Sequence, residues 1–139
     1  VGRAGWNNGP RSARLRSGPD GVDWRTDVSD AELDSLYAGA KAVVVASITE
    51  GFGLPVIEAL QRGTPVLSAD GGALPEAGGD LVEYFDPMSA TALHSLLLRH
   101  VDDAEHHVAR RELAGTYRPT TWADSARAVA AAIRREGGR

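Results

Sequence analysis

Cysteine is absent from the sequence. This absence excludes a disulfide framework, thiolate metal sites and cysteine nucleophiles, and it allows a reducing compartment. Long apolar runs are absent too: none approaches the roughly 20 residues needed to cross a bilayer, and no charged head precedes an apolar segment as in a signal peptide. We therefore predict a cytoplasmic protein whose full-length form could lie at the periphery of a membrane.

An excess of positive charge is also lacking, because the formal net charge is -4. The clustered basic residues are arginines, and no aromatic residues alternate with them as a stacking platform for bases would require. We interpret the cluster as a solvated surface, although it could also attract phosphates, and we expect no nucleic-acid partner. Its members are Arg3, Arg11, Arg14 and Arg16.

Motifs for metal ligands and nucleophiles are missing as well. The sequence has no Asp-x-Asp pair, and its histidines fall in a charged helical region without a carboxylate and histidine set at ligand spacing. Ser47 and Ser68 follow predicted strands but lie outside any Gly-x-Ser-x-Gly elbow, which argues against a hydrolase triad. We expect no metal and no cofactor, and solvated helix faces for His94, His100, His106 and His107.

Short apolar runs predict the strands. Residues 42–46 form a continuous run rich in valine, which is typical of a parallel strand covered on both faces. Further strands are predicted at residues 65–68 and 81–85, and helical segments lie between and after them. This alternation predicts an α/β fold with a partial Rossmann-like parallel sheet flanked by helices.

Local signals predict where the helices begin and end. Ser29 and Glu32 have the spacing of a capping box, so a helix should start at Asp30. A second helix should start near Pro55 and end before a left-handed cap at Gly63. Turn signals on either side predict a short helix at residues 12–16. Apolar periodicity predicts further helices along residues 93–101 and 122–133, with Trp122 in the core. The residues expected on the buried faces of the first two helices are Leu33, Leu36, Tyr37, Ala40, Val56, Ala59 and Leu60.

The loop of residues 47–54 is the place to look for a ligand site, because open parallel sheets bind ligands beyond the carboxyl ends of their strands. Gly51 and Gly53 allow a ligand to approach the backbone closely, and the next helix directs free N–H groups outward. An anionic diphosphate fits this environment.

Two carboxylates frame that loop, Glu50 before it and Glu58 in the helix after it. Carboxylates repel phosphate but accept hydrogen bonds from hydroxyls, so a nucleoside diphosphate sugar satisfies the whole pattern. A glutamate near a helix start is also a routine complement to the helix dipole, and a Gly-x-Gly pattern alone is weak evidence. From these residues both the ligand site and a structural role remain open.

The stretch from Glu50 to Leu60, EGFGLPVIEAL, resembles the Glu-x7-Glu signature of the retaining glycosyl transferases of group 1 (family 4). The flanking segments resemble the same family in the same order, from about Val1 to Ile133. They comprise residues 29–40, 63–66, 72–76, 79–80 and 85–87.

The resemblance implies a two-domain GT-B fold without a metal requirement, in which the second domain binds the nucleotide sugar. It implies that Glu50 contacts donor-sugar hydroxyls near the anomeric centre as the catalytic residue, and that Glu58 hydrogen-bonds the ribose diol. It also implies transfer with retention, with no protein nucleophile required. The remaining substrate-binding positions that it implies are backbone groups at Gly51, Phe52, Gly53 and Leu54, and the loop around Val28 near the base.

The chain departs from the family pattern in three places. The family's upstream Arg and Lys pair, which holds the diphosphate, has no counterpart here. Ala46 stands in place of a common proline, and Asp70 stands in place of a common asparagine. Because Val1 and Gly2 look like the tail of a strand, we expect residues upstream. Residues 1–139 are then part of the carboxyl-terminal donor-binding domain, and the acceptor domain is absent.

The leading interpretation is an enzyme fragment that is inactive alone and whose acceptor is unknown. Two other functions stay open. One is a non-catalytic nucleotide-sugar-binding or interaction module of the same fold. The other is half of a nicotinamide-dependent dehydrogenase, which is less favoured because no acidic residue closes the next strand. A sheet without its upstream strands exposes an edge, so we also expect self-association.

Overall fold

The computed structural model describes residues 1–2 and 9–136. Contacts divide the chain into two compact units, Val1–Gly39 and Ala40–Arg139, which are described separately below. Arg3 of the predicted basic cluster lies outside the described residues. Within this described part, no helix is both long and apolar enough to cross a membrane.

The first unit contains two helices, α1 (Gly9–Arg16) and α2 (Asp30–Gly39). The predicted capping box at the start of α2 is confirmed. The Ser29 amide donates to Glu32 Oε2 at 2.9 Å, and the Glu32 amide donates to Ser29 Oγ at 3.3 Å. Gly2 does not belong to a strand; its amide donates to the Arg25 carbonyl at 2.9 Å.

The face of α2 that was expected to be buried is only half-buried. Leu33, Leu36 and Tyr37 do share one face of the helix, as their spacing predicts. None of the residues of α2 is fully buried, however. Periodicity therefore identified the apolar face correctly and overestimated how completely it is covered.

The second unit is built on a parallel sheet of three strands in the order β1-β2-β3, which confirms the predicted fold class. The strands are β1 (Val43–Val45), β2 (Val66–Ala69) and β3 (Glu83–Phe85). Val43 lies opposite Val66, and Leu67 lies opposite Glu83. This register puts the carboxyl ends of the three strands at one edge of the sheet.

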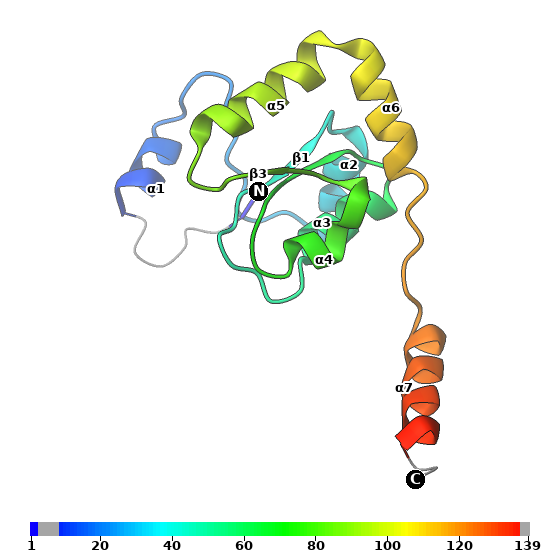
Figure 1. Ribbon diagram of the computed structural model, residues 1–139. Coiled ribbons are helices and arrows are strands. Elements are labelled where there is room, and N and C mark those ends of the chain that lie inside the picture. Colours follow the sequence, from blue (N-terminus) through cyan, green and yellow to red (C-terminus); the bar gives the residue numbers. More distant parts are fainter. Residues whose placement is uncertain (3–8, 137–139) are drawn as a thin grey trace. The chain divides into compact units, whose positions relative to one another are not determined.

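Helices flank this sheet, with α3 and α4 on one side of the strands and α5 and α6 on the other (Figure 1). Helix α3 packs against β1 and β2, and α5 packs against β3. The helices are α3 (Leu54–Gln61), α4 (Leu74–Gly78), the 3-10 turn η1 (Gly79–Leu81), α5 (Ala90–Asp102), α6 (Ala104–Ala114) and α7 (Trp122–Glu136).

The core forms where α3 meets β2. Every residue of β2 is buried, and so are the three predicted apolar positions of α3, Val56, Ala59 and Leu60. The helix ends as predicted, with Gly63 in the left-handed region at φ 65°. The central strand and its helix thus provide a rigid base for the loops at the carboxyl ends of the strands.

Two predictions about burial are wrong. Strand β1 is not covered on both faces, because the Val44 side chain is 41% exposed while Val45 is buried. Trp122 is not a core residue, because it is 92% exposed at the start of α7. In both cases an apolar pattern showed which residues could be buried but not whether a partner surface covers them.

Candidate functional site

The site begins with the loop that follows β1. There the Ser47 hydroxyl donates a hydrogen bond to Glu50 Oε1 at 2.7 Å, and both side chains are half-buried. A short bond to a charged carboxylate fixes the rotamer of Glu50 more firmly than a neutral bond would. Ser47 therefore positions the carboxylate that the sequence singled out, a role that the sequence alone did not reveal.

A second loop, which follows β2, packs directly on the backbone of the first. A Cβ atom at Gly72 would lie 3.2 Å from the Glu50 nitrogen, and one at Gly71 would lie 3.1 Å from the Ile48 carbonyl oxygen. Gly72 also has φ +57°, a conformation that residues with a side chain rarely adopt. The two glycines thus let the loop after β2 hold the backbone of Glu50 from one side.

The start of α3 is open. Gly53 is the N-cap at φ 74°, no side chain caps the helix, and Pro55 in the first turn has no N–H. A Cβ atom at Gly53 would lie 2.8 Å from Ala77 Cβ, so only glycine allows α4 to approach this closely. The first N–H groups of α3 therefore have no capping side chain, as the predicted anion site requires.

A cleft of about 370 Å³ lies beside this loop within the second unit. Phe52, which is 67% exposed, forms part of its wall. Its lining includes the predicted positions Gly51 and Phe52 but not Glu50 or Glu58. The other lining residues are Ile57, Ala73, Glu76, Ala77, Tyr117, Arg118 and Thr120.

Sequence reasoning missed the contribution of the segment after α6 to this cleft. Tyr117 and Arg118 are more than fifty residues beyond Phe52, and no local motif marks them. The Arg118 guanidinium donates to the Tyr117 carbonyl at 2.8 Å, which holds it on its own segment. It adds a positive charge to the cleft.

The remaining predicted positions lie on different elements. Glu58 is half-buried in α3, and its backbone carbonyl accepts a hydrogen bond from Arg62 at 2.7 Å. Leu54 is exposed at the first position of the same helix. Val28 belongs to the first unit, where it is half-buried immediately before the capping box of α2.

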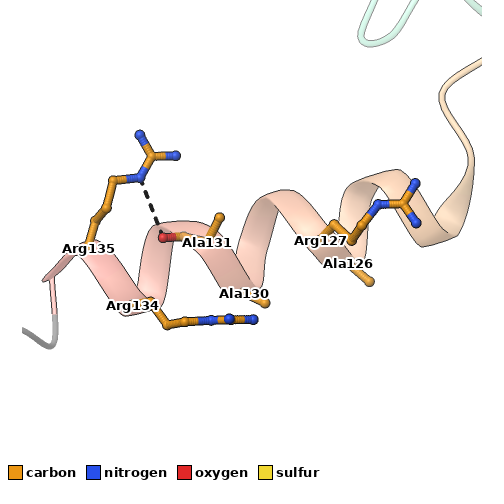
Figure 2. A pocket seen from close by; sticks show the side chains of 6 residues that line it. All are labelled: Ala126, Arg127, Ala130, Ala131, Arg134 and Arg135. Atoms are coloured by element: carbon orange, nitrogen blue, oxygen red, sulfur yellow. Dashed lines mark hydrogen bonds between the residues drawn. The ribbon is translucent and has the colours of Figure 1, made fainter.

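A larger hollow of about 670 Å³ runs along α7, but it does not have the form of a ligand site. Figure 2 shows that all six side chains that line it project from the same helix. They are alanines and arginines, and Arg135 Nε donates to the Ala131 carbonyl at 3.5 Å. One helix alone cannot surround a small molecule, so the cleft beside Phe52 is the better candidate.

The prediction of solvated helix faces holds for His94, which is exposed, but is wrong for His100. His100 is only 2% exposed, and its Nε2 lies 2.7 Å from Glu83 Oε2. His106 Nε2 lies 3.1 Å from Glu83 Oε1, and Arg110 Nε lies 3.4 Å from Glu83 Oε2. The ligand atoms of Glu83, His100 and His106 all lie within 4.8 Å of one another.

Electrostatics in this cluster favour a charged Glu83. Burial raises the pKa of the Glu83 carboxyl, but the hydrogen bond from His100 and the charges of Arg110, His106 and His100 lower it more, so the pKa lies below its ordinary value. Burial also lowers the pKa of the neighbouring His107, and the positive charge of Lys41 lowers it further. The cluster is thus one carboxylate surrounded by basic groups.

Comparison with known proteins identifies the family to which this architecture corresponds. The family model described as glycosyl transferases group 1 matches residues 11–114. The matched range contains both loops with Glu50, and α3 with Glu58. It also contains β3, α5 and α6, and therefore the cluster around Glu83.

Individual relatives agree with this match. An O-antigen chain mannosyltransferase B from Escherichia coli is 40% identical over 76 residues, which cover 55% of this chain and 20% of that protein. An MMP alpha-(1->4)-mannosyltransferase from Mycolicibacterium hassiacum is 36% identical over 86 residues, 60% of this chain and 21% of that protein. A D-inositol 3-phosphate glycosyltransferase from Corynebacterium kroppenstedtii is 40% identical over 103 residues, which cover 69% of this chain and 22% of that protein. The chain spans about a fifth of the length of these relatives.

Proposed function

The chain belongs to the group 1 glycosyl transferases, and on that premise we propose that it supplies much of the donor site of an enzyme that transfers a sugar from a nucleoside diphosphate sugar. Residues 1–139 are then part of a carboxyl-terminal donor-binding domain. The acceptor domain and the basic pair that holds the diphosphate belong to another part of the protein.

One observation carries this proposal: the Glu50 carboxylate is held by Ser47 at 2.7 Å immediately before the uncapped end of α3. A carboxylate beside an open helix start is suited to a ligand that carries both hydroxyls and phosphates. The hydrogen bond to Ser47 occupies Oε1 and leaves Oε2 for a sugar hydroxyl.

The roles follow from this arrangement. Glu50 accepts hydrogen bonds from donor-sugar hydroxyls near the anomeric carbon, and Glu58 accepts hydrogen bonds from the ribose diol. Backbone groups at Gly51, Phe52 and Gly53 contact the sugar and the diphosphate. As the bond to the leaving diphosphate breaks, the positive end of α3 stabilises the charge that develops on it.

Further contacts complete the donor site. The Leu54 amide, at the open start of α3, faces the diphosphate, and the loop around Val28 contacts the base. The acceptor attacks the anomeric carbon from the same face from which the leaving group departs. The product then retains the configuration of the donor, and no protein nucleophile is needed. The reaction then needs no cofactor.

Sugar transfer by the full-length protein tests this proposal. Candidate nucleoside diphosphate sugars are supplied, and NMR identifies the anomeric configuration of the product. We expect retention and a decrease of about 100-fold or more in kcat for Glu50→Gln, which keeps the shape of the side chain but removes its charge. Glu105→Gln, on the exposed first turn of α6, serves as the matched control.

Three outcomes would argue against the assignment. An inverted product would exclude the proposed course of the reaction. Full activity of Glu50→Gln would remove its catalytic role. Binding of a nucleotide sugar without transfer to any acceptor would instead favour a non-catalytic binding module.

A further inference from the structure

The cluster around Glu83 lies apart from the donor loop, since Glu83 is the first residue of β3 and the loops lie beyond the carboxyl ends of the strands. Its three potential metal ligands come from three elements: Glu83 from β3, His100 from α5 and His106 from α6. His106 is 11% exposed and Glu83 14% exposed. This burial sets the cluster apart from the exposed acidic groups found on most protein surfaces.

The distances from Glu83 to the two histidines are close to those between ligands in a metal centre. Two ligands bound to one tetrahedral zinc ion, each at about 2.0–2.1 Å, lie about 3.3 Å from each other. His106 Nε2 lies 3.1 Å from Glu83 Oε1 and 3.2 Å from Oε2. His100 Nε2 lies 2.7 Å from Glu83 Oε2, so the imidazole must withdraw by only a few tenths of an ångström.

His107 supplies the outer contact that such centres use. Its Nδ1 lies 3.4 Å from Nδ1 of His100, on the opposite side of the His100 ring from Glu83. When Nε2 of His100 binds a metal, its Nδ1 carries the proton and can donate it to His107. Contacts of this kind fix the tautomer and the orientation of a metal-binding histidine.

We propose that Glu83, His100 and His106 form a binding site for a divalent transition metal ion of the zinc class. Two imidazoles and one carboxylate suit this class better than Mg²⁺ or Ca²⁺, which prefer oxygen ligands. Three protein ligands leave the fourth position for water. Bound metal would join β3, α5 and α6 and stabilise this side of the sheet.

Arg110 opposes the metal and thereby offers a sharp test. Its Nε lies 3.4 Å from Glu83 Oε2, and it also donates to the Leu81 carbonyl at 2.8 Å. A guanidinium this close repels a divalent cation. Removing its charge should therefore strengthen metal binding. If the cluster serves only as a network of hydrogen bonds, removing this charge should instead weaken the cluster.

The experiment uses the full-length protein, purified without a polyhistidine tag and stripped with a chelator. Zn²⁺ is titrated against a chromophoric indicator, and Co²⁺ absorption reports the coordination geometry. We expect one Zn²⁺ per chain in this cluster and a tetrahedral Co²⁺ spectrum. His106→Gln should weaken Zn²⁺ binding by about tenfold or more. His94→Gln, on the exposed part of α5, should leave it unchanged.

Arg110→Gln should bind Zn²⁺ several-fold more tightly, which keeps the proposal testable if His106→Gln does not fold. NMR of the unmodified protein adds a direct measurement, because Co²⁺ should shift the ring signals of His100 and His106 far more than those of His94. The proposal is overturned if the protein binds no stoichiometric Zn²⁺. It is also overturned if His94→Gln weakens binding as much as His106→Gln, or if Arg110→Gln weakens it.

Discussion

The Ser47 hydroxyl and the Glu50 carboxylate are joined by a hydrogen bond of 2.7 Å across the loop that follows β1. The bond ties the proposed catalytic carboxylate to Ser47, which lies three residues before Glu50 and two residues after the end of β1. It explains how a residue on a loop can keep a fixed orientation. It also makes Ser47 a positioning residue, since its hydroxyl acts through Glu50.

Ser47→Ala should therefore lower kcat more than it lowers nucleotide affinity. Hydrogen bonds to charged groups contribute about 1.5–3 kcal/mol, so we expect kcat to fall by about 10- to 100-fold. Affinity for the free nucleoside diphosphate, measured by calorimetry, should hardly change. Ser95→Ala removes a hydroxyl that bonds the Thr91 carbonyl on α5 and serves as the control. Equal losses in kcat and nucleotide affinity would exclude a positioning role.

Gly72 and Gly79 provide a matched pair for testing the contact between the two loops. Both have a positive φ, +57° at Gly72 and +50° at Gly79, but of the two only Gly72 would bring a Cβ atom against the Glu50 backbone. Each alanine variant should lose about 1–2 kcal/mol of stability from backbone strain. Gly72→Ala should in addition lose sugar-transfer activity. Chemical denaturation measures the stability of each variant, and a transfer assay measures its activity. If both variants retain equal activity, the loop after β2 does not position Glu50.

The Glu32 carboxyl in the capping box should titrate below its usual range. Hydrogen bonds from the Ser29 hydroxyl and amide lower its pKa in the folded state. Glu32 therefore stabilises α2 fully above its unfolded pKa, and this contribution is lost as the pH falls through the folded pKa. Ser29→Ala should raise the Glu32 pKa, as followed by NMR titration, whereas Ser35→Ala should not. An unchanged Glu32 pKa in Ser29→Ala would contradict the hydrogen bonds of the capping box.

The exposed edge at β1 should promote self-association. Val44 is 41% exposed on a strand that pairs with β2 alone among the described residues. A lysine at an edge strand discourages pairing with another chain, so Val44→Lys should increase the monomer fraction in light scattering. Val108→Lys, at an exposed valine on α6, is the control. A monodisperse monomer before any substitution would refute this expectation.

Sequence reasoning succeeded where a signal is local. The capping box at Ser29 and the glycine after α3 act within a few residues, and the predicted start of α2 and end of α3 are confirmed. The apolar run of β2 is buried because the strand is central. Helix α4 escaped prediction because it has only five residues in a glycine-rich stretch.

Where burial or contact depends on distant parts of the chain, the sequence was a poor guide. Val44 and Trp122 have apolar side chains, but no partner surface covers them in the described residues. The pairing of His100 with Glu83 joins residues 17 positions apart, on a helix and a strand. Within the loop site, a family resemblance predicts the roles of the two glutamates, whereas the contacts of Ser47 and Gly72 required coordinates.

The affinity of a nucleoside diphosphate for the full-length protein and for Glu58→Ala tests the donor-site assignment most directly. Calorimetry gives both affinities, circular dichroism checks that the variant is folded, and Glu105→Ala serves as the control. If Glu58 holds the ribose diol, the affinity should fall by about tenfold or more. An unchanged affinity in a folded Glu58→Ala protein would contradict the account.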